Sequence, residues 1–147
     1  MPLSNFEIKR NNIRYNSWIA NTFLPENFDT ITIAAWVCTK CQNKEDMSQH
    51  VRNHECTHAR QWVECMLASG VIIWALVLFA GLSAWWFFLS FLMFYVLYVL
   101  EWIVRLPFYR KDAYNHISFE QEAYKNQYDN NYLENGDYFG WVKYLIE

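Results

Sequence analysis

The sequence predicts an α+β, mainly helical fold: a small N-terminal sheet, a long helix that runs into a transmembrane helical hairpin, and a further helix near the C-terminus. Three observations predict it. Positions 46–66, without proline or glycine, carry His54 and His58 four residues apart; positions 65–100 hold no charged residue; and positions 30–37 form a β-branched run. At 147 residues the chain is long enough for one core and not for two, so we expect a single membrane-embedded domain over 1–147.

Composition narrows the class of protein. With 54% hydrophobic and 20% aromatic residues, the chain is too apolar to be disordered. The net charge is −3 and the twelve basic residues are spread along the sequence, so no nucleic-acid-binding surface is expected. Cys38 and Cys41 have the C-x-x-C spacing of half a zinc site or of a redox pair, but no second C-x-x-C follows. We expect all four cysteines to be ordinary thiols in a reducing compartment.

The N-terminal third predicts the sheet. Positions 30–37 are β-branched and partly alternating between polar boundaries, which indicates a strand, and positions 6–8 and 13–19 are weaker strand candidates. We expect a small sheet that packs on the helix at 46–66. The first thirty residues contain charges and asparagines throughout, so no signal peptide is expected, and any membrane signal is internal.

The helix at 46–66, which Ser48 or Asp46 could cap, carries a metal-binding pattern. Residues four apart share a helix face, so His54 and His58 can present two imidazole nitrogens to one Zn²⁺. Glu55 can then reach a water at the open coordination position and act as its general base. The H-E-x-x-H pattern is short enough to arise by chance, and the alternative is a pair of surface or core histidines.

The uncharged segment predicts a membrane hairpin of two short helices, at 65–80 and 84–100, within a hairpin at about 65–104. Thirty-six uncharged positions are too many for one span of about 20 residues and just enough for two short ones. Gly81, Leu82 and Ser83 form the natural turn. The alternative is a buried hairpin of a soluble protein, or one that only dips into a leaflet. Rings that could form an interfacial belt are Trp74, Trp85, Trp86, Tyr95, Tyr98 and Trp102.

Topology supports two crossings, because a single crossing would separate the histidines from the acidic cluster downstream. The tip of the hairpin has no basic residue, whereas its open end has several, which places both termini in the cytoplasm by the positive-inside rule. The lipid bilayer is therefore an expected partner. The flanking basic residues are Arg52, Arg60, Arg105, Arg110 and Lys111.

After the hairpin, Glu101 and Arg105 are four apart and could pair on the helix surface. Pro107 is expected to end or kink this helix. A helix is expected over 113–131, and an aromatic tail at 138–146 forms a short helix or strand that covers part of the core.

A catalytic zinc needs a third protein ligand, and the predicted C-terminal helix offers Glu120 and Glu122. Two residues apart on a helix, they point about 160° away from each other, so only one can face the metal. The alternative is that both glutamates are solvated while Phe119 and Ala123 pack in the core.

His54-Glu55-x-x-His58 followed by Glu-x-x-Ala resembles the gluzincin group of zinc metallopeptidases, in which a second helix supplies a glutamate as the third ligand. Placing Ala123 on the alanine of that group puts Glu120 at the metal position and Tyr124 where an Asp or Asn is usual. Over 53–127 the chain is also similar to small, uncharacterised bacterial membrane proteins assigned to the group.

The resemblance implies a zinc-dependent, membrane-bound endopeptidase that acts on a peptide or protein substrate, with its active site on the cytoplasmic side of a bacterial inner membrane. The strand at 30–37 would border the cleft, and Tyr114, His116 and Tyr124 are candidates for stabilising the transition state. Two alternatives differ in class: a membrane protein whose metal site is structural or vestigial, and a small structural membrane protein whose motif is accidental.

Overall fold

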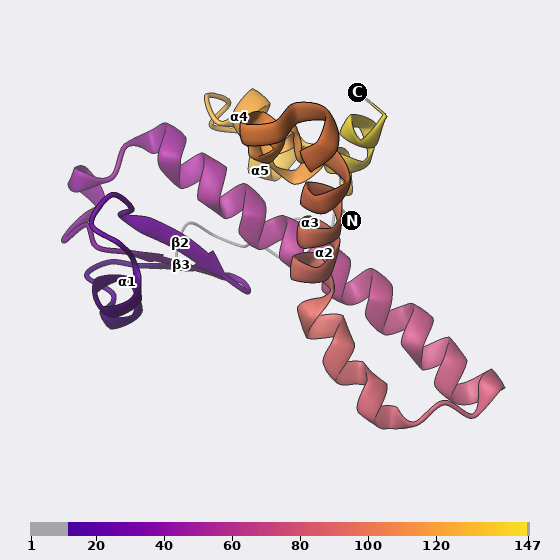
Figure 1. The fold of residues 1–147 in the computed structure, drawn as a ribbon. Helices are drawn as coiled ribbons and strands as arrows, with labels where there is room; N and C mark the ends of the chain where they lie inside the picture. The colour runs from indigo at the N-terminus through magenta and orange to yellow at the C-terminus, as the bar shows by residue number, and fades with distance from the viewer. Residues whose placement is uncertain (1–11, 147) are drawn as a thin grey trace. The chain divides into compact units, whose positions relative to one another are not determined.

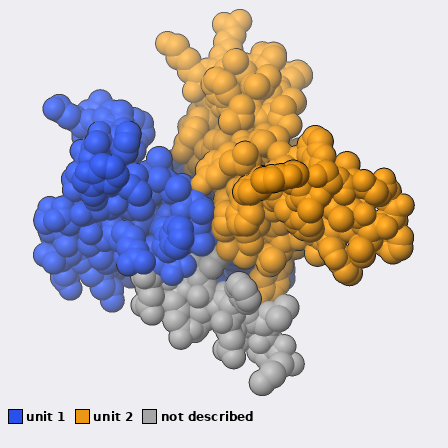
Figure 2. Space-filling view, turned by 90° about the horizontal axis from the view of Figure 1, so that it is seen from below, with its two compact units in different colours: residues 1–60, 122–137 blue, residues 61–121, 138–147 orange. Residues whose placement is uncertain are grey.

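A computed structural model describes residues 12–146, which fold as two compact units (Figure 2). Among these residues, the first unit combines 12–60 with 122–137, and the second combines 61–121 with 138–146. The predicted mainly helical fold, with a small N-terminal sheet and two long apolar helices, is confirmed (Figure 1).

The sheet of the first unit has three strands, β1 (Ile13–Arg14), β2 (Thr30–Ile33) and β3 (Trp36–Thr39), in the order β1-β3-β2. β1 pairs parallel to β3, and β2 pairs antiparallel to it. The prediction of one strand over 30–37 is wrong, because the chain reverses at Ala34, which adopts a φ of +54°. The strand expected over 13–19 is also too long, since α1 (Trp18–Phe23) begins within it; the candidate at 6–8 lies outside the described residues.

The sheet packs on the N-terminal part of α2 (Gln49–Ala80), as expected. Ile13 of β1, Val37 of β3 and Cys56 of α2 share one buried cluster with Met47. This cluster shows which face of the sheet is turned toward α2. Because neighbouring residues of a strand point to opposite faces, every second residue of β2 also points toward α2. All four cysteines are free thiols.

α2 is preceded by a 3₁₀ turn, η2 (Lys44–Asp46), in which Asp46 accepts a hydrogen bond from the Asn43 backbone N–H. Ser48 directly precedes the helix, and its carbonyl accepts the Arg52 N–H at 3.1 Å, so Ser48 and not Asp46 lies at the predicted start. The helix then continues for 32 residues, about 48 Å, with no break at the two histidines.

The second unit contains a hairpin formed by α2 from residue 61 onward and by α3 (Phe87–Tyr109). α2 ends at Ala80, Gly81 turns with a φ of +67°, and the 3₁₀ turn η3 (Ala84–Trp86) leads into α3, so the predicted turn is confirmed. Pro107 does not end α3, because it lies inside the last helical turn, two residues before Tyr109.

Within the described residues, two helices are long and apolar enough to cross a membrane. In the apolar 18-residue stretch of the first helix only 22% is buried, and in that of the second helix only 11%. The core helix of a soluble protein, in contrast, is mostly buried. Their side chains therefore present a large apolar surface. Large apolar residues exposed along it include Leu67, Val71, Ile72, Trp74, Phe79, Phe88, Phe91, Val99, Leu100, Ile103, Val104 and Phe108.

The helix expected over 113–131 is shorter in the structure. The 3₁₀ turn η4 (Arg110–His116) precedes α4 (Ser118–Asn126), and the short helix α5 (Tyr132–Asn135) follows it. The aromatic tail forms a last 3₁₀ turn, η5 (Gly140–Leu145).

Arg60 of α2 holds the segment after α4 within the first unit. Its guanidinium donates to the backbone carbonyls of Tyr132, Gly136 and Asp137 and lies over the Tyr132 ring, 5.6 Å from the centroid. Arg60 is counted among the basic residues that flank the hairpin. It is buried, and its guanidinium binds backbone carbonyls of the protein.

Candidate metal centre

The two predicted histidine ligands lie one turn apart on α2 and are buried, with 8% of His54 and 7% of His58 exposed. Their Nε2 atoms are 3.1 Å apart, and the rings meet edge to face with centroids 4.7 Å apart. Both imidazoles therefore turn the same ring nitrogen toward a common point.

The separation of the two nitrogens matches a shared metal ion. Zinc binds imidazole nitrogen at about 2.0–2.1 Å in tetrahedral sites, which places two such ligands about 3.3–3.4 Å apart. The observed 3.1 Å is close to this value and is also a hydrogen-bond distance. A third group at the same point would distinguish a metal site from a simple pair of histidines.

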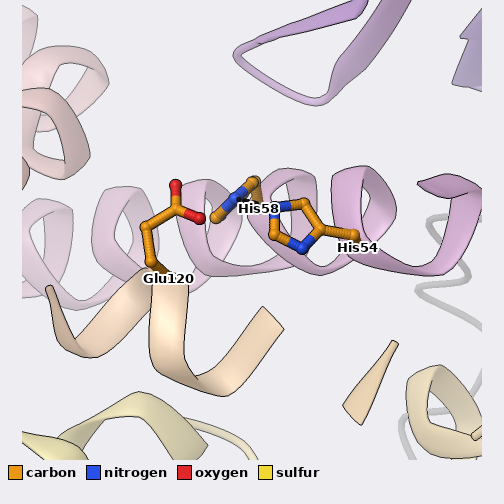
Figure 3. Close-up of side chains that lie close together, drawn as sticks. All are labelled: His54, His58 and Glu120. Carbon is orange, nitrogen blue, oxygen red and sulfur yellow. Dashed lines mark hydrogen bonds between the residues drawn. The ribbon is translucent and has the colours of Figure 1, made fainter. Parts of the chain in front are cut away.

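Glu120 of α4 supplies this third group (Figure 3). One ligand atom from each of His54, His58 and Glu120 lies within 4.8 Å of the other two, and all three residues are buried. Only 1% of Glu120 is exposed. The structure thus brings together the three residues that the sequence predicted as ligands, and the group could hold a metal ion.

Glu122, the alternative third ligand, has a different partner. Its Oε1 accepts a hydrogen bond of 2.6 Å from the Tyr132 hydroxyl, and its backbone carbonyl accepts one from the Asn126 amide. The reading in which both glutamates are solvated is wrong, because only 1% of each is exposed.

The first turn of α4 is held by side chains from the two long helices of the second unit. Glu101 of α3 accepts the backbone N–H of Ser118 at 2.9 Å and its hydroxyl at 2.6 Å. Gln61 of α2 donates to the carbonyl of Phe119 at 3.0 Å. Because Glu101 takes up one of the unpaired N–H groups at the helix start, it determines where α4 begins.

The Glu101–Arg105 pair predicted from the sequence is present, with Arg105 Nη2 3.1 Å from Glu101 Oε1. It is not on the surface: both side chains are 10% exposed, and Arg105 also donates to the carbonyls of Tyr144 and Leu145. Arg105 therefore links α3 to the C-terminal turn, and through Glu101 it is also connected to the start of α4.

Tyr98 of α3 contacts the candidate ligand directly, and sequence reasoning missed this role. Its hydroxyl donates a 2.6 Å hydrogen bond to Glu120 Oε1. The sequence assigned Tyr98 to an interfacial belt. A signal was available, since Tyr98, Glu101 and Arg105 follow at i, i+3 and i+7 on an otherwise apolar helix and so form one polar stripe.

Glu55, the predicted general base, is half-buried and bonded to the sheet of its own unit. Thr32 of β2 donates its hydroxyl to Glu55 Oε2 at 2.6 Å and also contacts the Glu55 carbonyl oxygen at 3.3 Å. Among residues 12–146, Glu55 Oε1 has no hydrogen-bond partner. One carboxylate oxygen is thus positioned by the protein while the other can accept a proton.

His54 and the neighbouring Asn53 contact the segment at and after the end of α4 within the first unit. The Tyr124 ring lies edge-on to His54, with centroids 4.5 Å apart, where the gluzincin pattern would have an Asp or Asn. Asn53 donates to the Gln127 carbonyl at 2.9 Å and to the Asn130 side chain at 3.0 Å. α2 is therefore tied beside His54 to the segment that follows α4.

The two other candidates for transition-state stabilisation differ in their contacts. His116 lies 3.2 Å from Asp112 and stacks on the Tyr109 ring at 3.7 Å. The Tyr114 ring lies 6.3 Å from that of Tyr98, next to the partner of Glu120.

No protein-family model, curated protein or solved structure matches this chain. Its function is therefore inferred from its own residues and their geometry. A buried set of two imidazoles and one carboxylate is the donor set of catalytic zinc sites that keep a fourth position open. These residues fit zinc chemistry in number, type and spacing.

Proposed function

We propose that the chain is a zinc-dependent, membrane-bound endopeptidase that hydrolyses peptide bonds. The observation that carries the proposal is the buried group of His54, His58 and Glu120, with ligand atoms within 4.8 Å of one another. The H-E-x-x-H and Glu-x-x-Ala pattern, which resembles that of gluzincins, supports it.

The chain's own residues divide the chemistry between them. His54, His58 and Glu120 would hold the metal, and Glu55, next to His54 on α2, would take a proton from the attacking water and return it to the leaving amine. Bound zinc would polarise the scissile carbonyl and lower the pKa of water toward about 7. Thr32 keeps the Glu55 carboxylate in one orientation through their 2.6 Å hydrogen bond.

The substrate would be an extended segment of a peptide or protein. β2 lies at the edge of the described sheet, and its residue Thr32 touches the proposed base. An edge strand offers unpaired backbone groups with which an extended peptide can pair. A substrate segment paired with β2 in this way would have its backbone next to Glu55.

The hairpin of α2 and α3 would anchor the enzyme in a bacterial inner membrane, with lipid covering its exposed apolar side chains. A cytoplasmic active site follows from the basic residues at the open end of the hairpin. Arg60 and Arg105 are used inside the protein, so the exposed Arg110 and Lys111 are the flanking charges available to the membrane surface.

The metal content of the detergent-purified chain tests the proposal. We expect about one zinc per chain in the wild type, and loss of zinc in His58→Ala and Glu120→Ala, because each substitution removes one of only three protein ligands. Elemental analysis of the dialysed protein measures this ratio.

Glu122→Gln is the matched control, since it changes a neighbouring buried glutamate of the same helix that bonds Tyr132. It should retain zinc. A wild-type protein that binds no zinc after reconstitution would overturn the proposal and favour an accidental motif. Zinc that is lost in Glu122→Gln and kept in Glu120→Ala would reverse the ligand assignment.

Thr32→Val tests the positioning of Glu55. Removing the hydroxyl frees the carboxylate to rotate, and we expect about a tenfold lower kcat, equivalent to about 1.4 kcal/mol, with zinc content unchanged. Hydrolysis of a mixture of fluorescence-quenched peptides measures it. Thr30→Val is the control, because Thr30 on the same strand bonds Thr39 within the sheet; an equal loss in both variants would point to damage to β2 instead.

A further inference from the structure

Tyr98 has contacts that fix its hydroxyl at one place in the second unit. Its ring stacks on Phe119, with planes 9° apart and centroids 6.1 Å apart, and packs on Phe94 at 5.8 Å. From this position it donates the 2.6 Å hydrogen bond to Glu120. The phenol is therefore held by the neighbouring rings before any metal binds.

Glu120 needs such a contact, because a glutamate side chain has three rotatable bonds and can place its carboxylate in many positions. The backbone of its helix turn is already fixed by two hydrogen bonds: the Ser118 N–H donates to Glu101, and the Gln61 amide donates to the Phe119 carbonyl. The hydrogen bond from Tyr98 acts on the carboxylate itself. Carboxylates that ligate metals are generally oriented by hydrogen bonds of this kind.

We propose that Tyr98 is the positioning residue for the metal ligand Glu120, so that metal affinity depends on a phenol carried by the apolar helix α3. The inference rests on the proposed metal function of Glu120 and adds a residue to it. It also gives the hairpin a second task besides anchoring: α3 supplies the donor that orders the third ligand.

The test is zinc affinity of the full chain in detergent, measured by competition with a chromogenic chelator. Tyr98→Phe keeps the stacked ring and removes only the hydroxyl. We expect it to bind zinc about 10–100-fold more weakly than the wild type. Tyr95→Phe, a half-buried tyrosine of the same helix that packs on Phe94, is the matched control and should bind zinc like the wild type.

A double-mutant cycle separates positioning from a general loss of structure. If Tyr98 acts through the carboxylate, Tyr98→Phe should cause a much smaller change in zinc affinity in a Glu120→Ala background, where only the weaker binding by His54 and His58 remains, than in the wild type. Thermal unfolding of the metal-free variants should show Tyr98→Phe and Tyr95→Phe folded alike.

The outcomes distinguish this inference from the proposed function. A wild type that binds zinc together with a Tyr98→Phe variant of equal affinity would overturn the role of Tyr98 and leave the metal site standing. Additive effects in the cycle would do the same, because they place the action of Tyr98 elsewhere. A wild type without zinc would overturn both.

Discussion

Replacing Glu55 by glutamine is expected to lower the rate of peptide hydrolysis about 10²–10⁴-fold, the usual contribution of a general base, while zinc stays bound. Glutamine keeps the size of the side chain and can still accept the hydrogen bond from Thr32, but it cannot take a proton. Initial rates on fluorescence-quenched peptides and zinc content, both measured on the same detergent-solubilised sample, check the two halves of this result.

Glu45→Gln is the control for this substitution, because Glu45 is an exposed glutamate of the turn before α2. Its rate should equal that of the wild type. Zinc bound at full occupancy with a hydrolysis rate that Glu55→Gln does not change would mean that the measured activity is not catalysed by this site, and would favour a membrane protein with a structural metal site.

The helical part of the fold could be predicted because its signals are local. A stretch without proline or glycine continues into the uncharged segment, and this produces one helix through His54 and on to Ala80. Gly81 then supplies the positive φ at which the chain turns. Pro107 does not end the helix, because a proline removes only one backbone hydrogen bond and the helix continues for two more residues to Tyr109.

The hairpin in the sheet could not be read from its residues. Two-residue hairpin turns usually contain glycine or asparagine, which tolerate a positive φ, and here Ala34 and Ala35 occupy the turn. Ala34 adopts a φ of +54° because strand pairing on either side, with Ile33 opposite Trp36, outweighs its local preference. Tertiary pairing therefore overrode a sequence that looked like one continuous strand.

The candidate ligands could be predicted from the sequence, but the residues that hydrogen-bond to the site side chains could not. His54 and His58 follow from helix spacing, and Glu120 from its resemblance to a known pattern. Tyr98 and Thr32 contact Glu120 and Glu55 across 22 and 23 residues of sequence, a separation for which no local periodicity exists. Such partners are determined by how helices and strands pack, and only the structure reveals them.

The second large effect is expected from Glu101→Ala, which should destabilise the protein by about 3–5 kcal/mol, the range for removing one partner of a buried ion pair. The substitution leaves the Arg105 guanidinium buried without its carboxylate and takes from Ser118 the acceptor of both its N–H and its hydroxyl. In thermal unfolding of the metal-free protein in detergent, followed by tryptophan fluorescence, this corresponds to a Tm lower by about 6–20 °C.

Glu134→Ala, at an exposed glutamate of α5, should leave the Tm unchanged. The double variant Glu101→Ala with Arg105→Met should recover part of the lost stability, because it removes the uncompensated charge as well as its partner. Recovery will be incomplete, since Ser118 still lacks its acceptor and the C-terminal carbonyls lose the donor Arg105. If Glu101→Ala unfolded at the same temperature as Glu134→Ala, the network would not be what holds α4, and another contact would have to fix the helix that carries Glu120.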